Sequence, residues 1–509
     1  MPRLAPSLFR RAGSISPHLA TLLPACRTIV SAQTELRWIR RHVLDITYPP
    51  SGSQHYNHDN NDREKRTVCR PKRENPPPRR RRGIRIRAGQ QCLMTTTPSA
   101  GGSKNGRGKR SMARDDETED LLARLVARRG AGEPLQYVLG TQPFGDLEML
   151  CAKGVLIPRP ETEAWASMLA DLVFPPPSRT NQLEREIDRA REEGLRILDL
   201  CCGTGCVGLS LYARGMAARG RENKEGGISR ACRSLARVFG FDVEPRAVRL
   251  ARRNLRHNFR SSRNYGSVDS NRINKEVVEG AVAFRQADIF TDEWMAYLDE
   301  EPKTAPHEDR RARERRVDVL VSNPPYISQR GFRVDTARSV RNYEPKLALV
   351  PAGVSLCTPS TPQAPARSSI TPQTCAPEDI FYARLLEIAD ELCSRIAAFE
   401  VGDTAQAIRV AEMAIARFQA PHHLAPEVGE GNRDRLGAHA VARWDVVEIW
   451  RDWPDCRPSD GEEDVVLVRG REVPVRGSGH GRVVFLAQGQ MARNRFVNRG
   501  FRREVYASS

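Results

Sequence analysis

The 509-residue chain contains no long apolar run, no Cys-x-x-Cys pair and no acidic residue among its first 34 positions. Without a long apolar run, no segment is expected to cross a bilayer. The 12 cysteines are scattered, and the cluster formed by Cys201, Cys202 and Cys206 has no histidine nearby. We therefore expect reduced cysteine side chains and no metal site.

The formal net charge of +18 comes entirely from the N-terminal part of the chain. Residues 1–114 contain 24 Lys or Arg and 6 Asp or Glu, whereas the remaining residues contain 57 groups of each sign. A neutral body argues against the extensive phosphate contacts that a nucleic-acid enzyme makes. Nucleic acid is therefore not expected to be required for the chemistry.

Composition divides the chain into five regions. Residues 1–34 combine arginines with Ser, Ala and Leu, which is typical of a mitochondrial or plastid transit segment, with a disordered basic tail as the alternative. Residues 35–114 are predicted to be a basic low-complexity linker with one helix near 34–44, although an RNA-binding patch or a translated intron would look similar. The other regions are an N-terminal helical and lead-in segment (115–165), the main domain with polar insertions (166–490) and a tail (491–509).

Strand and helix patterns alternate through the main domain. Strands are predicted at 196–200, 238–242, 281–285, 317–322, 396–400, near 444–449 and near 483–486, with helices from 207, at 245–257, at 380–393 and at 404–418. This alternation predicts an α/β fold with a doubly wound, mostly parallel sheet and antiparallel strands at its end. Polar insertions at 214–235, 260–276, 299–316, 353–379 and 453–480 are predicted to be surface loops.

The sequence Asn323-Pro324-Pro325-Tyr326 follows an apolar strand. The Asn323 side-chain oxygen and a backbone carbonyl can accept both hydrogens of a planar NH2 group, while the prolines hold the backbone still. Such an NH2 nitrogen is a poor nucleophile, so it must be gripped and aimed at an electrophile before it reacts. The motif therefore favours methyl transfer to nitrogen, with a strand followed by a proline-rich turn as the alternative.

A glycine-rich turn joins the first strand to the helix after it. The predicted cofactor residues are Asp199, Cys201, Cys202, Gly203, Thr204, Gly205, Asp242, Asp288, Ile289 and Asn323. Glycines at this turn let the backbone approach a ligand, Asp242 ends the second strand where an acid can bind a ribose diol, and Asp288 can accept from an adenine amino group. On its own the turn would suit NAD equally well.

The glycine turn, the strand-end acids and Asn-Pro-Pro-Tyr occur in the order that resembles class I S-adenosylmethionine-dependent methyltransferases. Further segments are similar to the HemK/PrmC family of peptide-chain release factor N5-glutamine methyltransferases: PLQYVLG at 134–140, QPFG at 142–145, IPRPETE at 157–163, YEP at 343–345, Ala348-Leu349, and EVG at 400–402 with Gln406. The Asn-Pro-Pro-Tyr motif also occurs in adenine-N6 DNA methyltransferases and in some RNA methyltransferases, so these further segments are what favours the glutamine-N5 enzymes.

The resemblance implies S-adenosylmethionine as cofactor and the glutamine of a release factor's Gly-Gly-Gln motif as substrate. Asn323, Pro324 and Tyr326 would be the catalytic residues, with the Asn323 oxygen and the Pro324 carbonyl holding the amide. The implied substrate-binding set is Asn323, Pro324, Pro325, Tyr326, Arg159, Glu161 and Glu163. For the last three, a solvated salt-bridge cluster ahead of a helix is the alternative. We expect a monomer, without a membrane anchor, in the mitochondrial matrix.

Three departures from the family pattern stand out. Cys201 occupies the position where most relatives carry a glycine, and Ile289 replaces an aromatic residue found in some members. The family's N-terminal helical domain is recognisable only at 34–44 and 115–145. Two competing hypotheses remain, a methyltransferase for nucleic-acid adenine or guanine amino groups and a basic RNA-binding or scaffold protein with an inactive methyltransferase fold.

Overall fold

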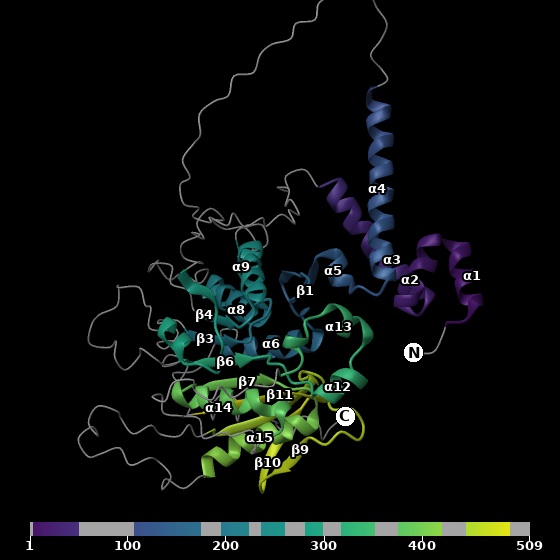
Figure 1. Cartoon of the computed structure of the whole chain (residues 1–509). Helices are drawn as coiled ribbons and strands as arrows, with labels where there is room; N and C mark the ends of the chain where they lie inside the picture. The colour runs from purple at the N-terminus through teal and green to yellow at the C-terminus, as the bar shows by residue number, and fades with distance from the viewer. Residues whose placement is uncertain are drawn as a thin grey trace, which may run out of the picture. The chain divides into compact units, whose positions relative to one another are not determined.

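The computed structural model describes residues 4–49, 106–174, 195–222, 236–259, 280–298, 317–351, 375–419 and 444–488. The chain divides into two compact units, Met1–Ala131 and Gly132–Ser509 (Figure 1). The division falls inside the segment 115–165 that the sequence treats as one region. Residues 50–105 of the predicted linker and the predicted tail lie outside the described residues.

The first unit contains the helices α1 (Pro6–Ile15), α2 (Pro17–Cys26), α3 (Ile29–Thr47) and α4 (Gly106–Gly130). The buried residues of α3 recur at helical spacing and include Leu36, Ile39 and Val43, and α4 buries Leu125 and Val126. Such stripes are the faces on which amphipathic helices pack. The predicted helix at 34–44 is part of α3, which packs with α2 and α4 in one helical unit.

The linker prediction also ends too late in the chain, because α4 already begins at Gly106. An ion pair joins α4 to α3, with the Arg129 Nε 2.6 Å from the Glu35 carboxylate and both side chains mostly buried. The transit-segment hypothesis for residues 1–34 concerns processing, so it stays a prediction. Residues 6–26, however, form helices that contribute Leu19, Leu22 and Leu23 to the core of this unit.

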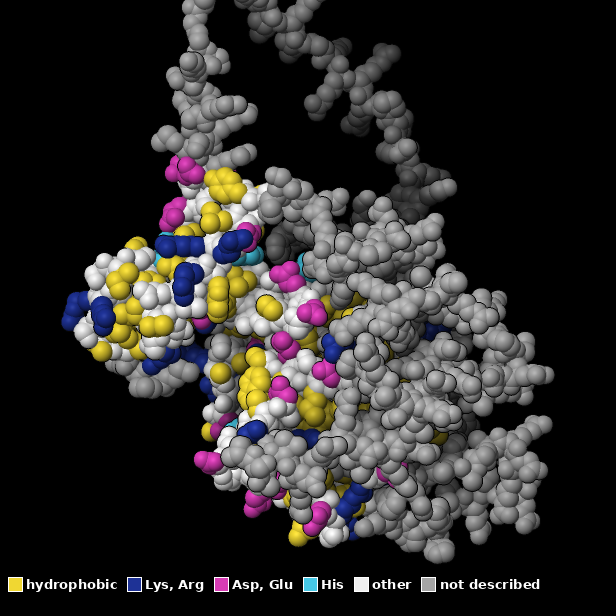
Figure 2. Space-filling view, turned by 180° about the vertical axis from the view of Figure 1, so that it is seen from behind, with side chains coloured by type: hydrophobic (Ala, Val, Ile, Leu, Met, Phe, Trp, Pro, Cys, Tyr) yellow, Lys and Arg dark blue, Asp and Glu magenta, His cyan; other side chains and the backbone are white. Residues whose placement is uncertain are grey.

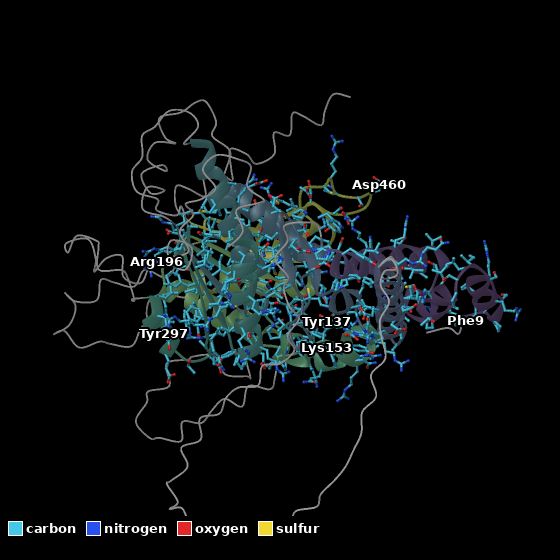
Figure 3. All side chains as sticks on the ribbon, turned by 90° about the horizontal axis from the view of Figure 1, so that it is seen from above. Phe9, Tyr137, Lys153, Arg196, Tyr297 and Asp460 are labelled. Carbon is cyan, nitrogen blue, oxygen red and sulfur yellow. The ribbon has the colours of Figure 1, made fainter. Side chains whose placement is uncertain are left out.

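The second unit opens with α5 (Leu135–Leu139) and a hairpin of β1 (Thr141–Phe144) and β2 (Leu147–Leu150), followed by α6 (Pro160–Val173). The Tyr137 hydroxyl donates to the Val155 carbonyl at 2.7 Å (Tyr137 is labelled in Figure 3). The Leu150 N–H donates to the Asn254 Oδ1 at 2.7 Å, which ties the hairpin to a buried polar residue of the main domain.

One nine-stranded sheet forms the centre of the second unit. Its strands are β3 (Leu195–Leu200), β4 (Ala236–Asp242), β5 (Val282–Gln286), β6 (Val319–Ser322), β7 (Ile396–Glu400), β8 (Val446–Trp453), β9 (Val465–Val468), β10 (Arg471–Arg476) and β11 (Ser478–Ala487). Their order is β5-β4-β3-β6-β7-β11-β8-β10-β9, and the neighbours β3, β6, β7 and β11 can be followed in Figure 1. Strands β3 to β7 are parallel, and β11 runs antiparallel to both of its neighbours. The prediction of a doubly wound, mostly parallel sheet with antiparallel strands at the end is confirmed.

Helices cover both faces of this sheet, so its central strands are apolar on both sides. In β7, Ile396 and Ala398 join the core cluster that includes residues of α6, α8 (Cys206–Glu222) and α9 (Pro245–Phe259). Ala397 and Phe399 join the opposite cluster with η2 (Glu293–Leu298), α14 (Ile380–Glu391) and α15 (Thr404–Gln419). The short helices α12 (Gln329–Val334), α13 (Arg338–Tyr343), η3 (Lys346–Ala348) and η4 (Pro377–Asp379) lie in the connections.

The prediction of a surface loop at 453–480 is wrong. This segment contains the antiparallel hairpin of β9 and β10, whose two-residue turn is formed by Arg469 and Gly470 with φ of 50° and 77°. Positive φ at both positions is what a tight hairpin turn of this length requires. Of the other predicted insertions, residues 214–222 belong to α8, and 223–235, 260–276, 299–316 and 353–374 lie outside the described residues.

Substituting Gly240 of β4 should destabilise the protein. A Cβ at Gly240 would overlap the ring of Phe284, which is only 3% exposed in the core. Overpacking of this kind costs about 1–3 kcal/mol, so urea unfolding of Gly240→Ala should show a clearly lower midpoint. Gly280→Ala is the matched control, because a Cβ there meets nothing within 4 Å. Equal midpoints for the two variants would contradict the packing described here.

Candidate active site

A pocket lies at the carboxyl ends of the parallel strands, where doubly wound sheets bind ligands. The site residues expected from sequence that line this pocket are Cys201, Gly203, Asp242, Asp288, Ile289, Asn323 and Pro325. Its remaining walls come from Gly154, Val155, Leu156, Val243, Glu244, Ala247, Ala287, Pro345, Leu347, Ala348 and Phe381. The structure therefore brings the glycine turn, both strand-end acids and the Asn-Pro-Pro-Tyr motif to one cavity.

The turn after β3 is held against the end of β4. The Gly203 N–H donates to the Asp242 carboxylate at 2.8 Å, and the Glu244 N–H donates to its other oxygen at 2.9 Å. Cys201, Gly203 and Gly205 have φ of 58°, 54° and 79°, so this turn uses the left-handed region at three positions. Burial raises the pKa of Asp242, while the two backbone N–H donors act in the opposite direction.

Four predicted cofactor residues lie behind the pocket wall instead of lining it: Asp199, Cys202, Thr204 and Gly205. The Asp199 carboxylate is 3% exposed and accepts the Gly208 N–H at 3.0 Å in the first turn of α8. Glycines 203, 205 and 208 complete a Gly-x-Gly-x-x-Gly spacing that our sequence analysis overlooked. These four residues shape the turn, and their direct contact with a cofactor stays a prediction.

Replacing Asp199 should change the pH dependence of stability. Burial raises the pKa of Asp199 from 3.8 to about 7, with Asp242 acting in the same direction and the Gly208 N–H against it. The folded state then binds more protons than the unfolded chain across this range, so the free energy of unfolding falls as pH rises from about 4 to about 7 and levels off above it.

The matched variant for this prediction is Asp199→Asn, which keeps an acceptor for the Gly208 N–H. Urea unfolding at pH 5 and pH 8 should show that wild type loses about 2–4 kcal/mol more than Asp199→Asn between the two conditions. Parallel pH profiles for the two proteins would contradict a raised pKa at this residue.

The Asn-Pro-Pro-Tyr residues present two free acceptors. The Asn323 Nδ2 donates to the Thr162 Oγ1 at 3.4 Å. Among the described residues, none donates to the Asn323 Oδ1 or to the Pro324 carbonyl oxygen. The Tyr326 hydroxyl donates to the Glu400 carboxylate at 3.1 Å, and burial together with Glu400 raises the pKa of this phenol. Of the four motif residues, Asn323 and Pro325 line the pocket, whereas Pro324 and Tyr326 do not.

The residues Arg159, Glu161 and Glu163 do not line the pocket. The Arg159 Nη2 donates to the buried Glu344 carboxylate at 2.7 Å, whose other oxygen accepts the Ile157 N–H at 3.1 Å. Glu161 and Glu163 lie in the first turn of α6, where negative charge interacts favourably with the helix dipole. These hydrogen bonds join the segment 157–163 to the segment 343–345. Contact of Arg159, Glu161 and Glu163 with a substrate stays a prediction.

Sequence reasoning missed the polar groups that support the motif. Glu400 is 1% exposed and accepts from the Thr162 hydroxyl at 2.7 Å and from the Trp165 Nε1 at 2.8 Å. The Gln406 Oε1 accepts the Gly402 N–H at 2.7 Å, and its Nε2 donates to the Tyr326 carbonyl at 3.4 Å. The Glu-Val-Gly…Gln pattern was visible in the sequence, but nothing local indicated that it surrounds Tyr326.

Metal-ion catalysis and a nucleophilic cysteine find no support in the part of the chain that the structure describes. No group of three or more His, Cys, Asp or Glu side chains could hold a metal ion there. Burial raises the pKa of the Cys201 thiol well above its usual value, so this pocket residue is a poor nucleophile.

Two surface properties concern binding partners. None of the helices in the described ranges is long and apolar enough to cross a membrane. Acidic and basic side chains are interspersed over the described surface seen in Figure 2.

Several known proteins with similar sequences are named as glutamine methyltransferases. The chain is 32% identical over 222 residues to the "Probable MRF1 mitochondrial N(5)-glutamine methyltransferase mtq1" of Schizosaccharomyces pombe, covering 44% of this chain and 53% of that protein. It is 25% identical over 350 residues to the "Mitochondrial MRF1 N(5)-glutamine methyltransferase MTQ1" of Saccharomyces cerevisiae, covering 69% and 68%. It is 29% identical to the "Release factor glutamine methyltransferase" of Vibrio cholerae, covering 45% and 55%.

The chain thus spans about half the length of the fission yeast and Vibrio proteins. No protein-family model matches it. Among solved structures, the N-terminal domain of human METTL16 in complex with SAH has a TM-score of 0.28 and 13% identity over 57% of this chain and 73% of that one, and no argument rests on it. In its motifs and in its sequence as a whole, the chain is similar to the HemK/PrmC family of release factor glutamine methyltransferases.

Proposed function

We propose that this protein transfers the methyl group of S-adenosylmethionine to the side-chain amide nitrogen of the glutamine in the Gly-Gly-Gln motif of a release factor. One observation carries the proposal. The Asn323 Oδ1 and the Pro324 carbonyl are free acceptors beside a pocket built from a glycine turn and strand-end acids. Two acceptors match in number the two hydrogens of a primary amide.

The residues of the pocket fit the proposed cofactor. Gly203 lines the pocket without a side chain. A Cβ at this position would contact no protein atom within 4 Å and would point into open space. Asp242 ends β4 with a carboxylate already oriented by two backbone N–H groups, which leaves it able to accept from a ribose diol. Ile289 and Ala247 add apolar wall for a flat ring. S-adenosylmethionine supplies an electrophilic methyl group on a positively charged sulfur.

The chain's own residues bind and aim the amide. Asn323 and Pro324 accept its two N–H groups, which fixes the plane of the amide and directs the nitrogen at the cofactor side of the pocket. As the N–CH3 bond forms, the S–CH3 bond breaks and the nitrogen loses one proton to solvent. The two acceptors stabilise positive charge on the nitrogen as it develops, so no strongly basic side chain is needed.

The substrate and compartment rest on the relatives. The names of two yeast relatives include "MRF1", "mitochondrial" and "N(5)-glutamine", and this supports a mitochondrial release factor as substrate. We place the reaction in the mitochondrial matrix and assign it to a monomer, which size-exclusion chromatography with light scattering tests. The neutral charge of residues 115–509 supports a protein substrate over nucleic acid.

A substrate panel tests the proposal against the nucleic-acid alternative. The full chain would be incubated with methyl-labelled S-adenosylmethionine and, separately, with a mitochondrial release factor, mitochondrial RNA or DNA. Label should enter only the release factor, and it should be absent when the Gly-Gly-Gln glutamine is replaced. Incorporation into RNA or DNA alone would overturn the proposed substrate class.

A further inference from the structure

A chain of buried hydrogen bonds runs from β7 through α6 to the Asn-Pro-Pro-Tyr motif. Glu400 ends β7, Thr162 and Trp165 lie on α6, and Asn323 follows β6. Glu400 and Thr162 are each 1% exposed, and Trp165 is fully buried. None of the pocket-lining residues is Glu400, Thr162 or Trp165, so these three groups act behind the wall and not on the substrate.

The donor and acceptor in each of these buried hydrogen bonds follow from the chemical groups involved. An indole N–H can only donate, and an ionised carboxylate can only accept. The Glu400 Oε2 accepts from the Trp165 Nε1 at 2.8 Å and from the Thr162 hydroxyl at 2.7 Å, while the Glu400 Oε1 accepts from the Tyr326 hydroxyl at 3.1 Å. Because an ionised carboxylate has no proton to donate, the Thr162 hydroxyl is the donor in its contact with Glu400.

The consequence reaches the amide of Asn323. Because the Thr162 hydroxyl uses its proton on Glu400, its oxygen faces Asn323 only as an acceptor. The Asn323 side chain must then turn its NH2 toward Thr162, at 3.4 Å, and its Oδ1 the other way. An asparagine amide has two ends of nearly equal size, so shape alone does not select between these orientations. Among the described residues, the oriented Thr162 hydroxyl is the hydrogen-bond partner of this amide, so it selects one orientation.

We propose that Thr162, held by Glu400, is the positioning residue that decides which end of the Asn323 amide faces the incoming substrate. The inference rests on the proposed amide methylation, because only a substrate NH2 needs the oxygen end. In the reversed orientation the Asn323 NH2 would face the substrate NH2, donor against donor, and binding for transfer would fail. The same carboxylate holds the Tyr326 ring through its hydroxyl, so Glu400 supports both ends of the motif.

The test compares Thr162→Val with Thr162→Ser in the full-length protein. Valine keeps the shape but has no acceptor, whereas serine keeps the hydroxyl. Thr162→Val should lower kcat for release factor methylation about 10–100-fold with the Kd for S-adenosylmethionine changed less than about twofold. Thr162→Ser should stay within about threefold of wild type. A uniform loss of kcat and cofactor affinity in both variants would show a merely structural role and overturn the proposal.

A second readout does not depend on methylation. In protein labelled with 15N-asparagine, the Asn323 side-chain NH2 signals would be assigned by their absence from Asn323→Ala. Thr162→Val should move these signals and speed their exchange with solvent, while Thr162→Ser should not. If wild type methylates no release factor but the signals behave as expected, the proposed function fails and the positioning role stands. If wild type methylates and neither kcat nor the signals respond to Thr162→Val, the positioning role fails alone.

Discussion

Asn323→Ala should lower kcat for methyl transfer by at least about 100-fold, because it removes one of the two acceptors aimed at the reacting nitrogen. Removal of a preorganised hydrogen-bonding group at a reacting centre acts on the transition state more than on cofactor binding. Asn323 lines the pocket beside Pro325 at the end of β6. The Kd for S-adenosylmethionine, measured by calorimetry, should therefore change less than about threefold.

Asn342→Ala is the matched control for this substitution. Asn342 is an exposed residue of α13 that does not line the pocket. Its variant should methylate at the wild-type rate. A wild-type rate for Asn323→Ala, or a loss of cofactor affinity as large as its loss of kcat, would show that the amide-gripping role assigned to Asn323 is wrong.

Asp242→Asn should weaken S-adenosylmethionine binding by about 10–100-fold, because a charge-assisted hydrogen bond contributes about 1.5–3 kcal/mol. Both carboxylate oxygens of Asp242 accept backbone N–H groups, one from Gly203 and one from Glu244. An asparagine would turn its NH2 toward one of these donors, so it disturbs the glycine turn as well as removing the charge that faces the pocket.

Calorimetric titration measures this effect, with Asp460→Asn as the control. Asp460 is exposed in the connection between β8 and β9 and lies outside the pocket lining. At saturating cofactor, Asp242→Asn should recover most of the wild-type kcat, which separates it from Asn323→Ala. Unchanged cofactor affinity in Asp242→Asn would exclude the strand-end acid as a cofactor ligand.

The parts of the site that could be predicted from sequence are those encoded locally. The apolar strand before Asp199, the acid at the end of the second strand and the two prolines after Asn323 each carry their signal within a few residues. Parallel strands then bring these ends together without further information. This is why six predicted cofactor residues line one pocket although the chain is only partly similar to any relative named here.

The parts that could not be predicted depend on distant contacts or on misleading composition. Thr162 and Glu400 are 238 positions apart, and no local pattern indicates that their side chains meet. The β9–β10 hairpin was hidden in a polar segment, although the pair Arg469-Gly470 between two valine-rich stretches is a turn signal. In the first unit, the basic composition of residues 35–114 indicated a linker throughout, whereas α4 already begins at Gly106.

The most direct test is to locate the transferred methyl group by mass spectrometry. A mitochondrial release factor would be methylated by the wild-type protein, digested and fragmented, with Asn323→Ala as the inactive control. The account predicts a single added methyl on the side-chain amide of the Gly-Gly-Gln glutamine, absent from the control reaction. A methyl on any other residue of the release factor, or the same glutamine methyl formed by Asn323→Ala at the wild-type rate, would contradict it.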